Sequence, residues 1–254
     1  LLLFRWARGP ERRRFFLAGL VVAAVSLAPL APWALRNWRV FHVFQPLAPR
    51  HANGPGEFVP LGYERWLRTW VVDYSSTEEV YWASQPVSVE RLPPRAFDSD
   101  DQRRRTEQLL SEYLPDDITP EVDAKFAQLA DERIRSTPLR YYVFLPAARV
   151  ADMWLRPRIE LLGLNTHWWD FESDPSDSAV SIALGLLNLA LVTAAVVGAV
   201  RGRVPHLAML VGWLLLRSAL LATLPAPEPR YTLECYPVLF LLAASNLSRA
   251  TQTP

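Results

Sequence analysis

Two short segments of this chain place arginines beside aromatic rings, a combination that can bind phosphate. Arg36 and Arg39 lie in the Pro-Trp-Ala-Leu-Arg-Asn-Trp-Arg-Val-Phe stretch of residues 32–41, and Arg230 is followed directly by Tyr231. Guanidinium groups form forked, charge-assisted hydrogen bonds to phosphate oxygens, so both segments could hold the phosphate of a lipid head group. A simpler interpretation is that these arginines only anchor helix ends at a membrane surface.

Composition and motifs argue against several other kinds of site. The chain has 27 lysines and arginines against 26 aspartates and glutamates, so no basic excess favours nucleic acid as a partner. Its single cysteine, Cys235, cannot form a disulfide or a thiolate metal cluster within one chain. HExxH, Walker, GxSxG and GxGxxG motifs are absent from the sequence. The four histidines are scattered without ligand spacing, so no metal or cofactor is evident: His42, His51, His167 and His206.

Two acidic pairs are the remaining candidates for acid/base chemistry or for a divalent ion. They are Asp100-Asp101 and Asp116-Asp117. Adjacent carboxylates can serve either purpose, but helix N-caps and solvated turns explain both pairs better.

Each of the two arginine segments adjoins an apolar run, and the helix expected in that run would set the position of the arginines. Four runs are long enough, or nearly so, to cross a bilayer: residues 15–33, 179–200, 207–224 and 231–247. The last has about 17 residues, the lower end of the usual range for a span. The sequence therefore predicts a mainly α protein, an integral membrane helical bundle of about four transmembrane helices with a largely helical extracytoplasmic segment.

Arginines in the short loops predict the orientation of these spans. They place residues 1–14 and 201–203 in the cytoplasm and residues 34–178 outside, in a multi-pass protein of the cell (inner or plasma) membrane. A signal peptide over residues 12–32 is the competing interpretation of the amino end, although its apolar stretch is long. Arg217, within the third span, either snorkels to the surface or faces a polar bundle interior.

The outer segment has helical spacing over residues 62–74, 101–114 and 120–135, the last with Thr119 as N-cap. Residues 138–155 combine an apolar stripe with polar positions. The stripe is Leu139, Tyr142, Val143, Val150, Met153 and Trp154, and the polar positions are Arg140, Arg149, Asp152 and Arg156. This pattern suits a helix lying on the membrane surface, or equally an amphipathic helix packed on its neighbours, and Pro146 would kink either one.

These segments resemble the carboxyl-terminal part of bacterial GT-C glycosyltransferases related to protein O-mannosyltransferases and the aminoarabinose transferase. Residues 32–41 are similar to the Pro-Trp-x-x-Arg-Asn-x-x-Val-Phe stretch that leaves a transmembrane helix in that family. Arg230-Tyr231, with Pro237, is similar to the closing element before the family's final helix, and residues 140–158 look like its linker.

The resemblance implies transfer of a sugar from a polyprenyl-phosphate donor to an extracytoplasmic acceptor, without a nucleotide sugar. It assigns the donor phosphate to Arg36, Arg39, Arg230 and Tyr231, makes membrane lipid a second partner, and allows for a divalent metal ion in the full-length enzyme. The family's catalytic carboxylate lies in the first outer loop, which would precede Leu1, so the chain alone is expected to be inactive.

The missing catalytic signature motivates a second hypothesis. Asp100-Asp101 and Asp116-Asp117 match no motif of the family and do not replace its carboxylate. The chain could instead be a non-enzymatic membrane protein whose extracytoplasmic segment binds a partner or a ligand.

Overall fold

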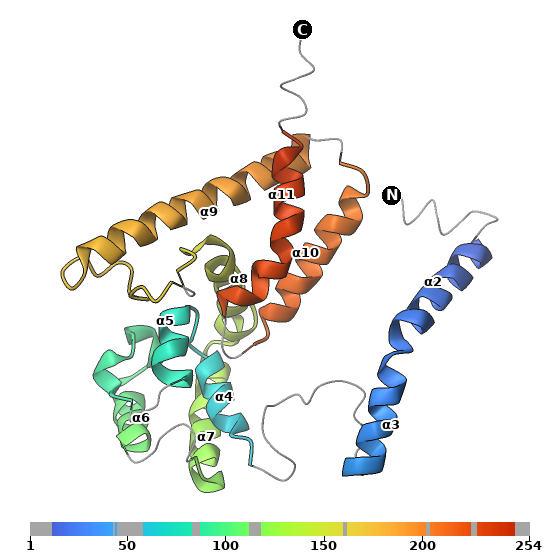
Figure 1. Ribbon diagram of the computed structural model, residues 1–254. Helices are drawn as coiled ribbons and strands as arrows, with labels where there is room; N and C mark the ends of the chain where they lie inside the picture. Colours follow the sequence, from blue (N-terminus) through green and yellow to red (C-terminus); the bar gives the residue numbers. More distant parts are fainter. Residues whose placement is uncertain are drawn as a thin grey trace. The chain divides into compact units, whose positions relative to one another are not determined.

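The computed structural model confirms the mainly helical class (Figure 1). It describes residues 12–42, 44, 58–82, 87–111, 118–159, 162–201, 204–224 and 228–246, and no strand forms among them. The chain divides into two compact units, Leu1–Val59 and Pro60–Pro254, and each has its own internal packing.

The first unit contains a helix that is broken in the middle. α2 (Arg12–Leu27) and α3 (Leu30–Phe41) meet at a bend of 43°. Pro29 has no N–H to continue the hydrogen-bond ladder of α2, which explains the break. The sequence predicted a transmembrane helix over residues 15–33, and that span stays a prediction. In the structure α3 runs on to Phe41 and carries the first arginine segment inside a helix.

The second unit begins with short helices that precede and pack on a longer one. They include α4 (Leu61–Arg68), α5 (Tyr74–Ser76), the π-turn η1 (Thr77–Tyr81), and the short 3-10 turns η2 (Val89–Arg91) and η3 (Pro94–Ala96). α6 (Asp100–Ser111) follows, then α7 (Pro120–Ser136). The hydroxyl of Thr119 accepts from the Val122 N–H, which confirms the predicted N-cap. α4 is shorter than predicted, because the carboxylate of Asp73 caps α5 in its place.

Aromatic side chains form the core of this outer segment. Trp66 of α4 and Trp70, in the turn after it, are fully buried with their ring centroids 5.3 Å apart, and Trp66 also packs on Phe126 of α7. The Asp123 carboxylate of α7 accepts from the backbone N–H groups at the start of α4. A Cβ at Gly62 would lie 2.1 Å from the Asp123 carbonyl oxygen, so only glycine permits this contact. The outer segment therefore has a hydrophobic core of its own.

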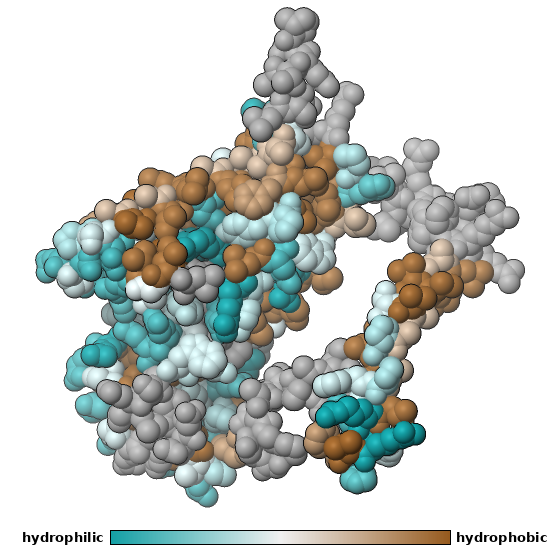
Figure 2. All heavy atoms as spheres, viewed as in Figure 1, coloured by the Kyte–Doolittle hydropathy of each residue, from teal (hydrophilic) through white to brown (hydrophobic). Residues whose placement is uncertain are grey.

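Apolar helices complete the second unit: α9 (Pro175–Arg201), α10 (Leu207–Leu221), the 3-10 helix η6 (Pro229–Cys235) and α11 (Tyr236–Ala244). Hydrophobic residues gather over α9 (Figure 2). Among the described residues α9 alone is long and apolar enough to span a membrane, and the bent pair α2–α3 adds a second if it counts as one span. A bundle of four spans stays a prediction, since α10 and α11 are shorter than the predicted runs.

α9 and α11 pack tightly and run toward the same end. The Tyr236 hydroxyl donates to Asn188 Oδ1 at 2.6 Å, and Gly198 lies so close to Leu242 that a Cβ there would be 1.8 Å from its carbonyl oxygen. A common direction is what the predicted inward, outward, inward alternation of α9, α10 and α11 requires. Arg217 of α10 pairs with Glu234 of η6, whose side chain is half exposed, and both the snorkelling and the interior-facing interpretation of this arginine stay predictions.

Residues 138–155 differ from the prediction in which side chains they bury. A π-turn, η5 (Arg140–Phe144), leads into α8 (Leu145–Leu155), and Pro146 lies in the first turn of α8. The predicted apolar stripe is divided between the two sides: Leu139, Tyr142 and Val143 are exposed, while Met153 is buried. The predicted polar side is wrong for Arg149 and Arg156, which are both buried. Arg149 is drawn inward because backbone carbonyls of α4 and its following turn accept its hydrogen bonds.

Candidate functional site

Arg36 and Arg39 are both exposed on α3, while Asn37 between them is buried. The Arg36 guanidinium lies 5.4 Å from the ring centroid of Trp33 and 5.5 Å from that of Phe41. Each such cation–π contact at an exposed site is worth about 0.5–1 kcal/mol. Arg39 is in the last turn of α3, where a cation complements the helix dipole. The rings thus hold one guanidinium in place without neutralising its charge.

An apolar groove of about 630 Å³ lies along the same unit. Its lining consists of Leu27, Leu30, Ala31, Ala34, Leu35, Trp38 and Phe44. The volume is within the range of small-molecule sites, and the lining suits a hydrocarbon chain. Arg39 follows Leu35 by one helical turn, so a guanidinium stands beside the apolar groove.

Arg230 and Tyr231 lie in η6 and share one buried carboxylate. Arg230 Nε pairs with Glu228, and the Tyr231 hydroxyl donates to Glu228 Oε1 at 3.0 Å. The Arg230 guanidinium is also 5.7 Å from the centroid of the Tyr231 ring. Glu228 is only 3% exposed, whereas the Arg230 side chain is 57% exposed. Since a guanidinium has five N–H donors, pairing at Nε leaves others to meet a phosphate.

Two tyrosines and an arginine belong to the same neighbourhood. The Arg156 guanidinium lies 4.8 Å from the centroid of the Tyr74 ring. Burial raises the pKa of Tyr74, and the negative charges of Glu78 and Glu228 add to this effect. Burial also raises the pKa of Tyr81, with Glu228 again contributing. Both phenols therefore stay protonated at neutral pH and can act as hydrogen-bond donors.

The structure groups the predicted residues in two places. Arg36 and Arg39 belong to one unit and Arg230 and Tyr231 to the other, and each pair stands beside aromatic rings within its own unit. That all four hold a single phosphate stays a prediction. Glu228 was not identified as a site residue from the sequence, because its burial, which makes it the shared partner of Arg230 and Tyr231, is a property of the folded chain.

The first acidic pair lies at the start of α6, where Ser99 and not an aspartate accepts the capping hydrogen bond from the Gln102 N–H. Asp100 and Asp101 are in the first turn of α6, and Asp101 forms ion pairs with Arg104 at 3.5 Å and Arg105 at 2.9 Å. The second pair, at 116–117, lies outside the described residues. Within the described residues, no three His, Cys, Asp or Glu side chains are grouped as a metal site needs.

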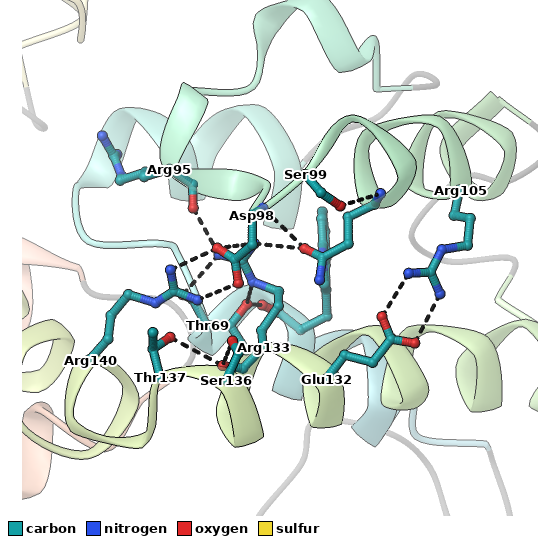
Figure 3. A network of polar contacts seen from close by, with 12 residues as sticks. Thr69, Arg95, Asp98, Ser99, Arg105, Glu132, Arg133, Ser136, Thr137 and Arg140 are labelled. Atoms are coloured by element: carbon teal, nitrogen blue, oxygen red, sulfur yellow. Dashed lines mark hydrogen bonds and ion pairs between the residues drawn. The ribbon is translucent and has the colours of Figure 1, made fainter.

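A larger polar network in the outer segment is structural (Figure 3). Arg133 of α7 is 1% exposed and donates to Thr69 Oγ1 and to the Arg95 carbonyl oxygen, each at 2.8 Å. Arg140 holds both carboxylate oxygens of Asp98 at 2.7 Å, and Asp98 also lies 3.1 Å from Arg133 Nη1. Burial lowers the pKa of Arg133 to about 10, which leaves it charged at neutral pH. The network joins α6, α7 and η5 through groups that already have partners.

Comparison with protein-family models, with curated proteins and with solved structures gives no match for this chain. Its function must therefore be argued from the two arginine segments themselves. Both join an exposed guanidinium to aromatic rings, and one of them adds an apolar groove.

Proposed function

We propose that this chain is part of a membrane glycosyltransferase, the carboxyl-terminal part according to the family resemblance, which moves a sugar from a polyprenyl-phosphate donor to an extracytoplasmic acceptor. Arg36, Arg39, Arg230 and Tyr231 hold the donor phosphate in this proposal. The catalytic carboxylate is supplied by a part of the enzyme outside this chain, and any divalent ion would belong to the full-length enzyme.

The observation that carries the proposal is the combination of groove and guanidinium on α2 and α3. A polyprenyl phosphate has a long hydrocarbon tail and a compact dianionic head, so its site needs an apolar channel that ends at cations. The groove past Leu35 and Trp38 supplies the first, and Arg39, one helical turn beyond Leu35, supplies the second, while Arg36 adds a further positive charge on another side of α3. A head-group anchor alone would need the arginines but no groove.

The Glu228 cluster supports the same proposal from the second unit. Glu228 holds Arg230 and Tyr231 in one orientation while Arg230 remains exposed. A guanidinium that is already oriented loses less side-chain entropy when it binds an anion. The neighbouring phenols of Tyr74 and Tyr81 offer neutral donors that could bind sugar hydroxyls.

A binding experiment on the detergent-solubilised chain tests this proposal. We expect a short-chain polyprenyl phosphate to bind and the corresponding phosphate-free polyprenol to bind much more weakly. Arg36→Ala should weaken binding of the phosphate by about ten- to a hundred-fold, as loss of a charged hydrogen bond does, and Arg36→Lys by less. Arg104→Ala, an exposed arginine of α6, is the matched control. Equal binding of phosphate and alcohol would refute the proposal.

A polar groove favours the alternative function, a non-enzymatic membrane protein whose outer segment binds a ligand. The groove has a volume of about 380 Å³ and lies between α6 and α7. Its lining consists of Arg105, Gln108, Leu109, Lys125, Gln128 and Leu129. Amides beside a lysine suit an anionic sugar, so the alternative predicts that glucuronate raises the melting temperature of the chain and that Lys125→Ala abolishes this shift. No shift at saturating glucuronate counts against it.

A further inference from the structure

Residues 138–155 differ from a water-soluble amphipathic helix in their exposed side, which is apolar, and in their charged side chains, which are buried or half-buried. Every exposed residue in this segment is apolar or a tyrosine: Pro138, Leu139, Tyr142, Val143, Phe144, Ala147, Ala151 and Leu155. Its charged residues are all buried or half-buried: Arg140, Arg149 and Asp152. An amphipathic helix in contact with water shows the reverse arrangement.

The buried side combines two apolar residues, Leu145 and Met153, with an arginine that completes the hydrogen bonding of another helix. Arg149 is 2% exposed, and its Nε donates to the Val71 carbonyl oxygen at 2.8 Å. Its Nη2 donates to the carbonyl oxygen of Arg68, the last residue of α4. The final carbonyls of a helix have no partner within it, and a cation there also complements the dipole. The inward position of Arg149 thus has a defined structural role, which fixes the orientation of α8.

With that orientation fixed, the apolar side must face outward. Leu139, Tyr142 and Phe144 are each about two-thirds exposed, and Val143 is more than half exposed. The later members, Ala147, Ala151 and Leu155, follow at intervals of four residues, so the exposed surface is a stripe along one side. Exposed apolar patches of this extent are rare on monomeric soluble domains and mark a surface that is covered in the working protein.

The stripe lies on an element that packs against the apolar helices. Trp154 Nε1 donates to Ser218 Oγ of α10 at 3.0 Å, and Asn188 of α9 donates to the Trp154 carbonyl oxygen at 2.8 Å. α10 itself exposes large leucines, among them Leu216 and Leu220. The segment therefore belongs to the same packed unit as the helix that is long enough to span a membrane.

We infer that residues 138–155 lie in the outer surface of the lipid bilayer, with the exposed stripe from Leu139 to Leu155 inserted among the acyl chains. Tyr142 and Phe144 are residue types that suit this depth, because aromatic side chains concentrate at membrane interfaces. The stripe spans about 25 Å at 1.5 Å per residue, which gives a line of contact rather than a single anchor. The segment would hold the outer core at a fixed height above the membrane.

Fluorescence quenching on the full chain tests this inference. In a Cys235→Ser background, which removes the only cysteine, single cysteines at Val143 and at Ala151 are labelled with bimane. Gln108, exposed on α6, supplies the matched control position. The labelled chains are reconstituted into phosphatidylcholine and phosphatidylglycerol vesicles that carry a nitroxide near the top of the acyl chain. We expect the nitroxide to quench both stripe labels several-fold more than the Gln108 label, and aqueous iodide to show the opposite order.

Two other results would each overturn the inference. Stripe labels that iodide quenches as strongly as the control would place the stripe in water. Labels shielded from both quenchers would place it against protein, either a second copy of this chain or another partner. Using two label positions guards against local damage at one of them. The readout needs no sugar donor, so it is independent of the proposed glycosyl transfer.

Discussion

α7 and the segment 138–155 follow one another in the chain and are similar in length, but they expose opposite kinds of side chain. α7 turns Val122, Phe126 and Leu129 toward the core and leaves most of its charges outside. The next segment buries Arg149 together with Leu145 and Met153, and its exposed side chains are apolar or tyrosine. Both patterns have helical periodicity. Helical periodicity in the sequence therefore predicts which side chains share one side of a helix, while the surroundings decide which side is covered.

The largest expected loss of unfolding free energy comes from a substitution on the core side of α7. Phe126→Ala removes a ring that packs on Tyr63 and Trp66, and it should lower the free energy of unfolding by about 3–5 kcal/mol. Tryptophan fluorescence during chemical denaturation in detergent measures this loss, since Trp66 and Trp70 lie in the same core. Ala124→Ser, at an exposed position of the same helix, should change little.

A smaller loss is expected on the inward side of α8. Arg149→Ala leaves the carbonyls of Arg68 and Val71 without this donor, which should lower the free energy of unfolding by about 1–3 kcal/mol. Arg135→Ala, an exposed arginine of α7, is the control, and the same denaturation experiment compares them. If Arg149→Ala were as harmless as the control, the inward side of α8 would not depend on its hydrogen bonds.

The contribution of Asp98, which pairs with Arg133 of α7 and Arg140 of η5, to the free energy of unfolding should decrease in acid. Burial acts to raise the pKa of Asp98, but the hydrogen bond from Arg140 and the charge of Arg133 outweigh it and lower the pKa overall. A carboxyl whose pKa is lower in the folded state stabilises the protein above its unfolded pKa. That stabilisation is lost as the pH falls below about 4 and through the folded value.

Asp98→Asn should remove this contribution, so its unfolding free energy should change less than that of wild type between neutral and acidic pH. Denaturant midpoints measured over this range compare the two proteins. An identical acid dependence in both would show that Asp98 does not link α7 to η5 electrostatically.

The smallest change in unfolding free energy is expected for a substitution in the exposed stripe of residues 138–155. Val143→Ser removes an exposed side chain that supports no described core, so the unfolding midpoint in detergent should move by about 0.5 kcal/mol or less. A loss as large as that of Phe126→Ala would mean that the stripe is packed against protein, and the contrast between the two helices would disappear.

Local signals predicted the parts of the fold that depend on neighbouring residues. Thr119 before Pro120 fixed the start of α7, and the apolar run after Asp177 predicted α9. The sides of α8 could not be predicted this way, because the carbonyls that draw Arg149 inward belong to a helix far earlier in the chain.

The candidate site shows the same division. The exposed arginines could be identified from their aromatic neighbours, and Arg36 does lie against Trp33. The role of Glu228 depends on its burial, and the groove depends on where the chain bends at Pro29. Neither the burial of Glu228 nor the groove corresponds to a local pattern in the sequence.

The hydrogen bond between Tyr236 and Asn188 has a consequence for α11. α11 has only nine residues and packs beside the long helix α9. The Tyr236 hydroxyl donates to Asn188 Oδ1 at 2.6 Å, and sliding α11 along α9 would take this donor away from a side chain that is only 5% exposed. The position of α11 along α9 is therefore set by this hydrogen bond.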